Sequence, residues 1–492
     1  MISEALEKAR AFEREYAKFA DGERPALHLT APVGWMNDPN GFSVYKGEYH
    51  LFFQYHPYST QWGPMHWGHA KTRDFIRWEY LPAVMAPDMP YDNNGCFSGS
   101  AVELPDGRQL LLYTGVREVL RPDGLREQIQ SQCVAVGDGV NFEKYEGNPV
   151  LDISDLPEGA SAIDFRDPKL WREGDVYYAV MSSRGPDGSG MILRYKSEDG
   201  FHWTYEGVVD SCGNLYGKMW ECPDFFPLDG KQVLLVSPME MAPMGLEFHA
   251  GYGTVALLGS WDEEKHRFTR EQIHSVDYGI DFYAPQTMQT PDGRRIMIAW
   301  MQNWTNTRCQ RPGCHLYGCM TIPRELSIRH GRLIQNPVRE LENYRRNRVC
   351  YRDLVVDRPC HFAGVSGRAV DLTVEVRPSG NEMYQSFRLQ FAMDGIHRSE
   401  IVYKPNSSIV SIDRSRCGGR FDVVHEREFR VAPRQGELKL RLILDRNCVE
   451  LFVNDGEQTA TYMLYGPEEA DAICFAAQGS VVLNVEKYDL QG

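Results

Sequence analysis

The stretch Gly47-Glu-Tyr-His-Leu-Phe-Phe53 places a turn-forming glycine directly before a short apolar strand. The same pattern begins again at Gly107, Gly174, Gly230 and Gly293. Subtracting these positions gives intervals of 60, 67, 56 and 63 residues. Each interval leaves room for four short strands, so the stretch predicts a β-sheet unit that is repeated along the chain.

A second family of strands follows the first with nearly the same period. Each member carries an aromatic residue in phase, and these are Trp78, Phe142, Trp203 and Phe268, at intervals of 64, 61 and 65 residues. Two families in phase make a chance recurrence of glycine and apolar residues improbable. Five four-stranded sheets around one axis form a β-propeller, so we predict a five-bladed β-propeller over residues 25–333.

The segments on either side of the repeat follow other patterns. Apolar residues recur at helical spacing within residues 1–24, which predicts a short N-terminal helix, and they are Ala5, Leu6, Ala9, Phe12 and Tyr16. Residues 334–350 are predicted to be a linker with a helical turn. Beyond it, strictly alternating runs such as 370–376 and 438–444 predict an antiparallel β-sandwich over residues 351–492. The predicted fold class is therefore all-β, with the sandwich in a supporting role.

Composition and charge limit the classes of partner. The 492 residues include 53 Lys and Arg against 68 Asp and Glu, a net charge of −15. Nucleic-acid binders usually present a basic face, but the densest basic cluster here is the short run Arg345-Arg346-Asn347-Arg348. No apolar run approaches the ~20 residues that a membrane helix needs. We therefore predict neither a nucleic acid nor a membrane as partner.

The twelve cysteines are too dispersed for a disulfide-stapled domain. The charged N-terminus lacks the pattern of a signal peptide, so we predict reduced thiols and a cytoplasmic location. Cys309, Cys314 and Cys319, with His315 nearby, lack the close pairs typical of zinc sites. We interpret them as loop or core thiols and predict neither a metal nor a cofactor.

Three repeats bring a carboxylate to the start of the innermost strand, close to the predicted axis. Asp38 and Glu221 lie nine residues before their turn glycines, and Asp167 lies seven before its own. Like charges held close together raise the pKa of at least one group, so a carboxylate and a carboxylic acid can coexist. Such pairs are the usual machinery of glycoside hydrolysis. Asp38 and Asp167 each precede a proline and could singly be turn residues, but three carboxylates in phase favour a site.

Aromatic and polar residues are predicted to surround the same mouth. Aromatic walls suit the apolar faces of a sugar ring, and the candidates are Trp35, Trp62, Trp67, Phe97 and Trp220. Asn37 and Gln54 are candidates for binding sugar hydroxyls. The predicted substrate-binding residues also include four at the starts of the innermost strands, which are Ser98, Arg166, Cys222 and Tyr283.

Several motifs together carry a family resemblance. They are Trp35-Met-Asn-Asp-Pro-Asn-Gly41, Phe97-Ser-Gly-Ser100, Phe165-Arg-Asp-Pro168 and Trp220-Glu-Cys-Pro-Asp-Phe225, with 61–69, 281–286 and 445–454 fitting as well. In this order they resemble the signature blocks of glycoside hydrolase family 32, the invertase, fructanase and sucrose-6-phosphate hydrolase family. The resemblance covers nearly the whole chain beyond residue 25. It implies the family's five-bladed propeller followed by a C-terminal sandwich.

The resemblance also implies a role for each carboxylate. Asp38 would be the nucleophile, Glu221 the general acid and base, and Asp167, with Arg166 beside it, the residue that stabilises the transition state. The implied reaction is hydrolysis of a β-fructofuranosyl unit with retention, which needs carboxylates about 5–5.5 Å apart and no metal or cofactor. Lys218 and the segment 303–317 depart from the family pattern, which leaves the identity of the leaving group open.

We therefore expect a cytoplasmic β-fructofuranosidase acting on sucrose, sucrose 6-phosphate or short fructo-oligosaccharides. Alternatives in the same family are an exo-fructanase and a fructosyltransferase. An inverting five-bladed glycosidase of the arabinanase type is a further enzymatic alternative. From another class, a sugar-binding propeller without turnover stays open. If copies of the chain associate, we expect the contact to involve the sandwich.

Overall fold

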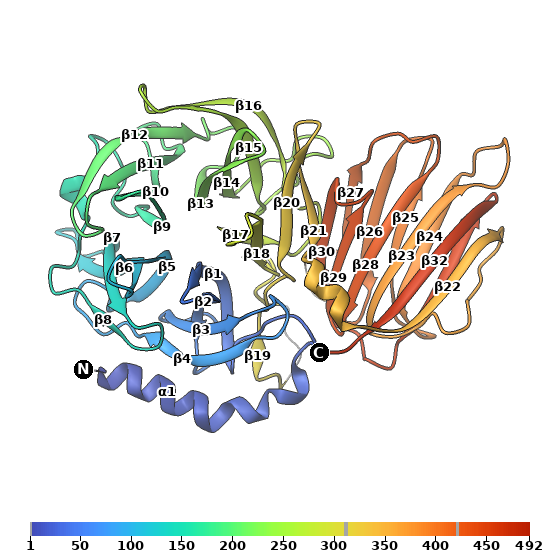
Figure 1. The fold of residues 1–492 in the computed structure, drawn as a ribbon, viewed down its shortest axis with the longest axis horizontal. Coiled ribbons are helices and arrows are strands. Elements are labelled where there is room, and N and C mark those ends of the chain that lie inside the picture. Colours follow the sequence, from blue (N-terminus) through green and yellow to red (C-terminus); the bar gives the residue numbers. More distant parts are fainter. Residues whose placement is uncertain (1, 309–312, 420–422) are drawn as a thin grey trace.

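The computed structural model describes residues 2–308, 313–419 and 423–492. Within these ranges the regular structure is almost entirely strand, apart from one α-helix and four short 3-10 helices. Figure 1 shows a ring of sheets, blue to yellow, beside a stack of two sheets in orange and red. No helix in the described ranges is both long and apolar enough to cross a membrane.

Five sheets of the described residues form the ring. The first, ordered β19-β1-β2-β3-β4, comprises β1 Gly34–Tyr45, β2 Glu48–His56, β3 His66–Thr72, β4 Glu79–Met85 and β19 Leu316–Tyr317. The second comprises β5 Gly95–Glu103, β6 Gln109–Leu120, β7 Arg126–Gly137 and β8 Phe142–Lys144. The third comprises β9 Arg166–Glu173, β10 Val176–Arg184, β11 Gly190–Ser197 and β12 Trp203–Ser211. The fourth comprises β13 Met219–Leu228, β14 Lys231–Met239, β15 Val255–Asp262 and β16 Arg267–Ser275, and the fifth β17 Tyr283–Gln289, β18 Arg295–Trp300, β20 Arg324–Arg329 and β21 Arg332–Pro337.

The repeat that the glycines predict is confirmed strand by strand. Each turn glycine joins the first and second strands of a sheet with a positive φ, and the values are 79° at Gly47, 80° at Gly107, 60° at Gly174, 77° at Gly230 and 87° at Gly293. Glycine adopts this conformation without the steric cost that a side chain would bring. The aromatic residues of the second family stand at or just before the fourth strands β4, β8, β12 and β16. The layout is consistent with a propeller.

The innermost strands β1, β5, β9, β13 and β17 surround the centre of the ring (Figure 1). Polar contacts join each of them to the next, and the contacts are Gly99 N to Asn40 Oδ1 (3.3 Å), Ser100 Oγ to Pro168 O (2.7 Å), Lys169 Nζ to Asp224 Oδ2 (3.0 Å), Thr287 N to Asp224 Oδ2 (2.6 Å) and Phe42 N to Gln286 Oε1 (3.3 Å). Because the series closes on itself, the strand starts are held at fixed distances from one another. The predicted site lies at these strand starts.

The N-terminal helix is α1, Glu4–Tyr16, and it is followed by the 3-10 helices η1 Ala17–Phe19 and η2 Asp21–Glu23. The Ser3 hydroxyl caps the helix by accepting a hydrogen bond from Leu6 N at 3.2 Å. On β4, Ala83 O accepts from Arg10 Nε at 2.8 Å and Ala83 N donates to Glu13 Oε2 at 3.1 Å. The helix is thereby fixed to the outside of the first sheet. Another 3-10 helix, η3 Ile153–Asp155, lies between β8 and β9.

Two stacked sheets form the C-terminal part of the chain. One comprises β22 Arg345–Val356, β32 Val481–Leu490, β23 Ala369–Pro378, β28 Leu438–Asp445, β29 Cys448–Val453 and β30 Gln458–Met463. The other comprises β27 Glu426–Arg430, β26 Ile409–Arg416, β25 Arg398–Lys404, β24 Ser386–Met393 and β31 Ala472–Gln478. Their inner faces share one apolar core, as the alternating runs predict. The segment 334–350 contains the end of β21, the 3-10 helix η4 Arg339–Tyr344 and the start of β22.

The stacked sheets hold the strand that carries Tyr283. Just before β17, the Asp281 carboxylate is paired with Arg414 and accepts from Met463 N at 2.8 Å. A second buried pair joins Arg324 Nη2 of β20 to Glu450 Oε2 at 2.6 Å. Breaking one partner of a buried pair typically costs about 3–5 kcal/mol, so these contacts fix the two parts of the chain to each other.

Candidate active site

Every innermost strand departs from regular pairing at its start. The irregularities lie between Met36 and Pro39, Phe97 and Gly99, Arg166 and Lys169, Glu221 and Asp224, and Tyr283 and Gln286. In the last three strands the residue before a proline has a positive φ, at 60° for Asp167, 48° for Cys222 and 51° for Ala284. A bulge re-aims the side chains on its strand, and such non-glycine residues store backbone strain. The sequence thus builds five matching bulges around one axis.

Asp38 lies in the bulge of β1 and is almost fully buried. Its Oδ1 accepts from Asn37 Nδ2 at 3.1 Å, and its Oδ2 accepts from Ser98 Oγ at 3.0 Å and Cys222 Sγ at 3.5 Å. Burial, followed by the nearby Glu221 carboxylate, raises the pKa of Asp38 from 3.8 to about 6, while these three donors oppose the rise. The structure therefore brings Asp38, Glu221, Asn37, Ser98 and Cys222 together.

Glu221 lies level with Arg166 and Tyr283 of the neighbouring sheets. Arg166 Nε donates to Glu221 Oε1 at 3.1 Å, and Tyr283 OH is 2.7 Å from Glu221 Oε2. The same phenol oxygen is 3.1 Å from Ser237 O, so its single proton has two possible acceptors. When that proton goes to Ser237 O, the phenol oxygen is free to accept a proton from Glu221. Tyr283 can therefore either donate a hydrogen bond to Glu221 or accept one from it.

Asp167 completes the group of carboxylates. Its Oδ2 accepts from Cys222 N at 3.0 Å and lies 3.8 Å from Arg166 Nε, and its backbone N donates to Thr114 Oγ1 at 3.0 Å. Burial raises the pKa of Asp167 to about 7, against the opposing effect of the Arg166 charge. Repulsion from the Glu221 and Asp38 carboxylates adds to the rise. Three carboxyl groups from three innermost strands thus lie together at the strand starts.

The aromatic residues separate into a wall and a core. Trp35 donates its indole N–H to Asn37 Oδ1 at 2.7 Å and stacks on Tyr317 with ring centres 4.4 Å apart. Trp62 is 46% exposed and meets Phe97 edge to face at 6.2 Å. Trp35 is buried with Cys222 and Tyr283, whereas Trp67 and Trp220 are buried in separate cores between sheets, so their placement at the mouth is wrong. Indole rings fill cores as readily as they line pockets, and the sequence does not separate the two uses.

The remaining predicted residues have local partners. Gln54 is buried, and its amide donates to Cys96 O at 3.0 Å. Of the cysteine group, Cys319 is buried with its Sγ 3.6 Å from Cys448 Sγ, while Cys309 lies outside the described residues. In the part of the chain that the structure describes, no three His, Cys, Asp or Glu side chains are grouped to hold a metal ion.

Comparison with known proteins identifies the family. The model of the glycosyl hydrolases family 32 N-terminal domain matches residues 28–337, and that of the family 32 C-terminal domain matches residues 340–490. The chain belongs to glycosyl hydrolases family 32. It is therefore a glycoside hydrolase, and the sequence resemblance is confirmed.

Relatives within family 32 match over nearly the whole chain. Sucrose-6-phosphate hydrolase of Zymomonas mobilis is 36% identical over 89% of this chain and 86% of that protein. Raffinose invertase of Escherichia coli is 36% identical over 96% of both chains. Among solved structures, the Bombyx mori GH32 β-fructofuranosidase superposes with a TM-score of 0.83 at 33% identity, over 99% of this chain and 98% of that one.

Other residues around this family 32 site were not predicted. Tyr252 packs edge to face on Tyr283 at 5.8 Å, and the Glu221 and Glu240 carboxylates help burial to raise its pKa. Trp304 and Tyr317 extend the aromatic wall from the segment 303–317, whose unusual length was the one available signal. Lys218, which departs from the family pattern, is exposed and pairs with Glu240 at 2.8 Å.

Proposed function

We propose that this enzyme releases the terminal β-D-fructofuranosyl unit of sucrose, sucrose 6-phosphate or short fructo-oligosaccharides, with retention at the anomeric carbon. The observation that carries the proposal is the group of Asp38, Asp167 and Glu221, the first two buried and the third half-buried, brought together from the starts of three of the five innermost strands. Relatives named sucrose-6-phosphate hydrolase and raffinose invertase, and a solved silkworm β-fructofuranosidase in complex with sucrose, support this class of substrate.

In the first step the Asp38 carboxylate attacks the anomeric carbon of the fructosyl unit. Glu221, in its protonated form, gives its proton to the glycosidic oxygen, and the bond to the leaving alcohol breaks as the ester to Asp38 forms. The donors from Asn37 and Ser98 hold the carboxylate of Asp38 in place for the attack. Asp167, fixed by Cys222 N, faces the positive charge that develops on the fructosyl ring.

In the second step water replaces the enzyme on the anomeric carbon. Glu221, now a carboxylate, takes a proton from the water, whose oxygen attacks the fructosyl ester and frees Asp38. The Arg166 guanidinium and the Tyr283 hydroxyl keep Glu221 in one position throughout, because each contacts a different carboxyl oxygen. Two inversions at the same carbon give net retention.

We expect kcat/KM to fall as the pH drops below about 6. Asp38 must be ionised to attack, and burial raises its pKa to about 6. Ser98→Ala removes a hydrogen-bond donor that favours the ionised form of Asp38. The acid limb, where kcat/KM falls with decreasing pH, should therefore move to higher pH by roughly one unit. Initial rates from pH 4 to 8 at constant ionic strength test this, with the exposed Ser260→Ala as matched control. An acid limb that stays in place in Ser98→Ala would count against Asp38 as the titrating nucleophile.

The proposed activity is tested by measuring free fructose released from sucrose, sucrose 6-phosphate, 1-kestose, levanbiose and inulin. We expect release from at least one small substrate, faster than from inulin, and none from Asp38→Ala. Longer oligosaccharides at high sucrose concentration would identify a fructosyltransferase. Binding of these sugars without release of fructose would favour a sugar-binding propeller, and release of the opposite anomer first would favour inversion. The order of rates identifies the preferred leaving group.

We further propose the finer organisation that the sequence predicts. The five sheets would be five blades of a propeller within residues 25–333, followed by the linker 334–350 and the sandwich 351–492, and the family matches at 28–337 and 340–490 support a division near this point. A cytoplasmic location is supported by Cys319 and Cys448, whose Sγ atoms lie 3.6 Å apart as two thiols rather than a disulfide. That copies of this chain associate through the sandwich stays a prediction.

A further inference from the structure

A second hollow lies on the same axis, at the other end of the innermost strands. It is a cavity of about 570 Å³. Each innermost strand passes from the active site to this cavity, which is lined by residues 42–44, 100–103, 169–173, 224–227 and 287–289. The lining begins two to four residues beyond the catalytic carboxylates, which is roughly 7 to 13 Å because a strand rises about 3.3 Å per residue. We call it the far cavity.

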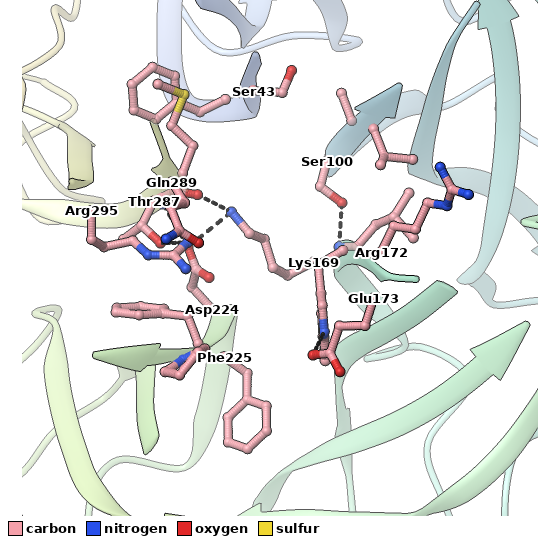
Figure 2. A pocket seen from close by; sticks show the side chains of 18 of the residues that line it. Ser43, Ser100, Lys169, Arg172, Glu173, Asp224, Phe225, Thr287, Gln289 and Arg295 are labelled. Atoms are coloured by element: carbon pink, nitrogen blue, oxygen red, sulfur yellow. Dashed lines mark hydrogen bonds and ion pairs between the residues drawn. The ribbon is translucent and has the colours of Figure 1, made fainter. Parts of the chain in front are cut away.

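The floor of the far cavity is a buried ion pair. Figure 2 shows Lys169 extending from β9 toward Thr287 and Asp224. Lys169 Nζ donates to Thr287 O at 2.5 Å and lies 3.0 Å from Asp224 Oδ2. An ammonium has three N–H donors, so one remains beyond these two contacts. Asp224 Oδ1 is buried and has no hydrogen-bond partner among the described residues.

A second cation stands beside this pair. Arg295 of β18 lines the far cavity, contacts Thr287 Oγ1 with Nη1 at 3.4 Å and covers the Phe226 ring at 4.6 Å (Figure 2). No carboxylate of the described residues lies within ion-pair distance of it. By contrast, Arg194 in the same lining pairs with Glu206 at 3.3 Å and Glu263 at 3.0 Å. Burial lowers the pKa of Arg295, the direction expected when counter-charge is insufficient.

The floor therefore holds two cations and one carboxylate. Lys169 and Arg295 both contact Thr287, so their donors converge on the same part of the cavity. Charges removed from water are normally paired, and here Arg295 has no carboxylate of the described residues at ion-pair distance, although Glu103, Glu173 and Glu263 also belong to the lining. An anion would supply the missing charge and acceptors. Asp224 Oδ1, however, needs a hydrogen-bond donor. Its negative charge would repel an anion that carries no proton.

We propose that the far cavity binds a phosphate group, with its oxygens accepting from Arg295 and Lys169 and its own O–H donating to Asp224 Oδ1. A guanidinium suits phosphate because its N–H donors match two oxygens at once. Near neutral pH inorganic phosphate keeps at least one O–H, whereas sulfate has none. The site thus distinguishes two oxyanions of similar size and shape by their protonation. The phosphate of a sugar monoester offers the same O–H in its monoanionic form, whose proton leaves with a pKa of about 6, so a monoester should bind better as the pH falls.

Isothermal titration calorimetry of the full chain tests the proposal, with inorganic phosphate, glucose 6-phosphate and sulfate at pH 6.5 and constant ionic strength. We expect one saturable phosphate site per chain and at least about tenfold weaker binding of sulfate. Arg295→Gln should weaken phosphate binding at least about tenfold, and the matched change Arg267→Gln, of an exposed arginine at the start of β16, should not. If Arg295→Gln also weakens the binding of glucose 6-phosphate, the occupant is a phosphate monoester. If Arg295→Gln weakens the binding of inorganic phosphate alone, the occupant is the free ion.

Two outcomes would overturn the proposal. One is the absence of saturable phosphate binding, or equal binding by the wild type and a folded Arg295→Gln, as judged by circular dichroism. The other is sulfate binding as tight as that of phosphate, which contradicts the contact to Asp224. If Arg295→Gln does not fold, wild-type crystals soaked in arsenate decide the question. An anomalous peak beside Arg295 and Lys169 supports the site, and its absence from the far cavity rejects it.

Discussion

Asp38→Ala is expected to lower kcat/KM for the preferred substrate by at least about 10⁴-fold, because a nucleophile that is removed cannot be replaced by positioning alone. Its carboxylate accepts from Asn37, Ser98 and Cys222, whereas the contacts that close the ring of sheets, such as Gly99 N to Asn40 Oδ1, do not involve it. The fold should therefore survive the change. Asp175→Ala, at a fully exposed carboxylate between β9 and β10, is the matched control and should keep full activity.

Asp38→Asn adds a prediction of opposite sign for stability. A folded-state pKa near 6 instead of 3.8 means that the ionised carboxylate costs the native state about 3 kcal/mol at pH 7. This cost arises as the pH rises from about 4 to 6 and is absent below both values. A neutral amide removes it, so Asp38→Asn should melt at a higher temperature than the wild type at pH 7, and the difference should shrink toward pH 4. Calorimetric scans at both pH values measure this.

A variant Asp38→Ala that kept most of its activity would show that another group attacks the fructosyl carbon. A lower melting temperature for Asp38→Asn at pH 7 would show that its hydrogen bonds outweigh the cost of its burial. The two readouts are independent, since one concerns the reaction and the other the free energy of unfolding. Together they separate a catalytic carboxylate from a turn residue, because loss of a turn residue lowers stability without abolishing turnover.

The architecture follows from local rules that a sequence expresses directly. Gly47 and its four counterparts stand at turns because they need a positive φ, and the apolar runs after them become second strands. The Phe165-Arg-Asp-Pro168 and Trp220-Glu-Cys-Pro-Asp-Phe225 motifs likewise mark strand starts on the axis. Proline and glycine restrict the backbone wherever they occur, so their spacing reveals the repeat before any long-range contact is known.

The arrangement within the site depends on register, which spacing does not reveal. Counting back from the turn glycines aligns Glu221 with Asp38, whereas strand pairing places it level with Arg166 and Tyr283. A second bulge of β1, between Asn40 and Ser43, contributes to the difference, because an inserted residue adds to the count back from the turn without advancing the strand pairing. The contact of Tyr283 with Glu221 joins residues 62 positions apart and depends on how neighbouring sheets pack. Such contacts are tertiary and leave no local pattern.

Glu221→Gln is expected to lower kcat by about 10²–10⁴-fold, the usual contribution of a general acid and base. Glutamine has nearly the shape of glutamate and can still contact Arg166 and Tyr283, but it cannot give or take the proton. The loss of activity should therefore appear in kcat more than in KM. Removing the negative charge of Glu221 also lowers the pKa of Asp38, because repulsion from that charge helps to raise it. The acid limb of the residual activity should therefore lie at a lower pH than in the wild type.

Azide provides the decisive measurement on Glu221→Gln. This anion attacks the fructosyl ester without needing a general base, so it should speed the second step and yield β-fructosyl azide, most clearly with a fructoside whose leaving group departs without a proton. The β configuration is the one that two inversions produce, and an α product would instead indicate single inversion. Glu240→Gln, at the exposed carboxylate paired with Lys218, is the matched control and should respond to azide as the wild type does. If azide gave no β-fructosyl azide while Glu240→Gln proved equally slow, the acid and base role would have to move from Glu221 to another carboxylate at the mouth.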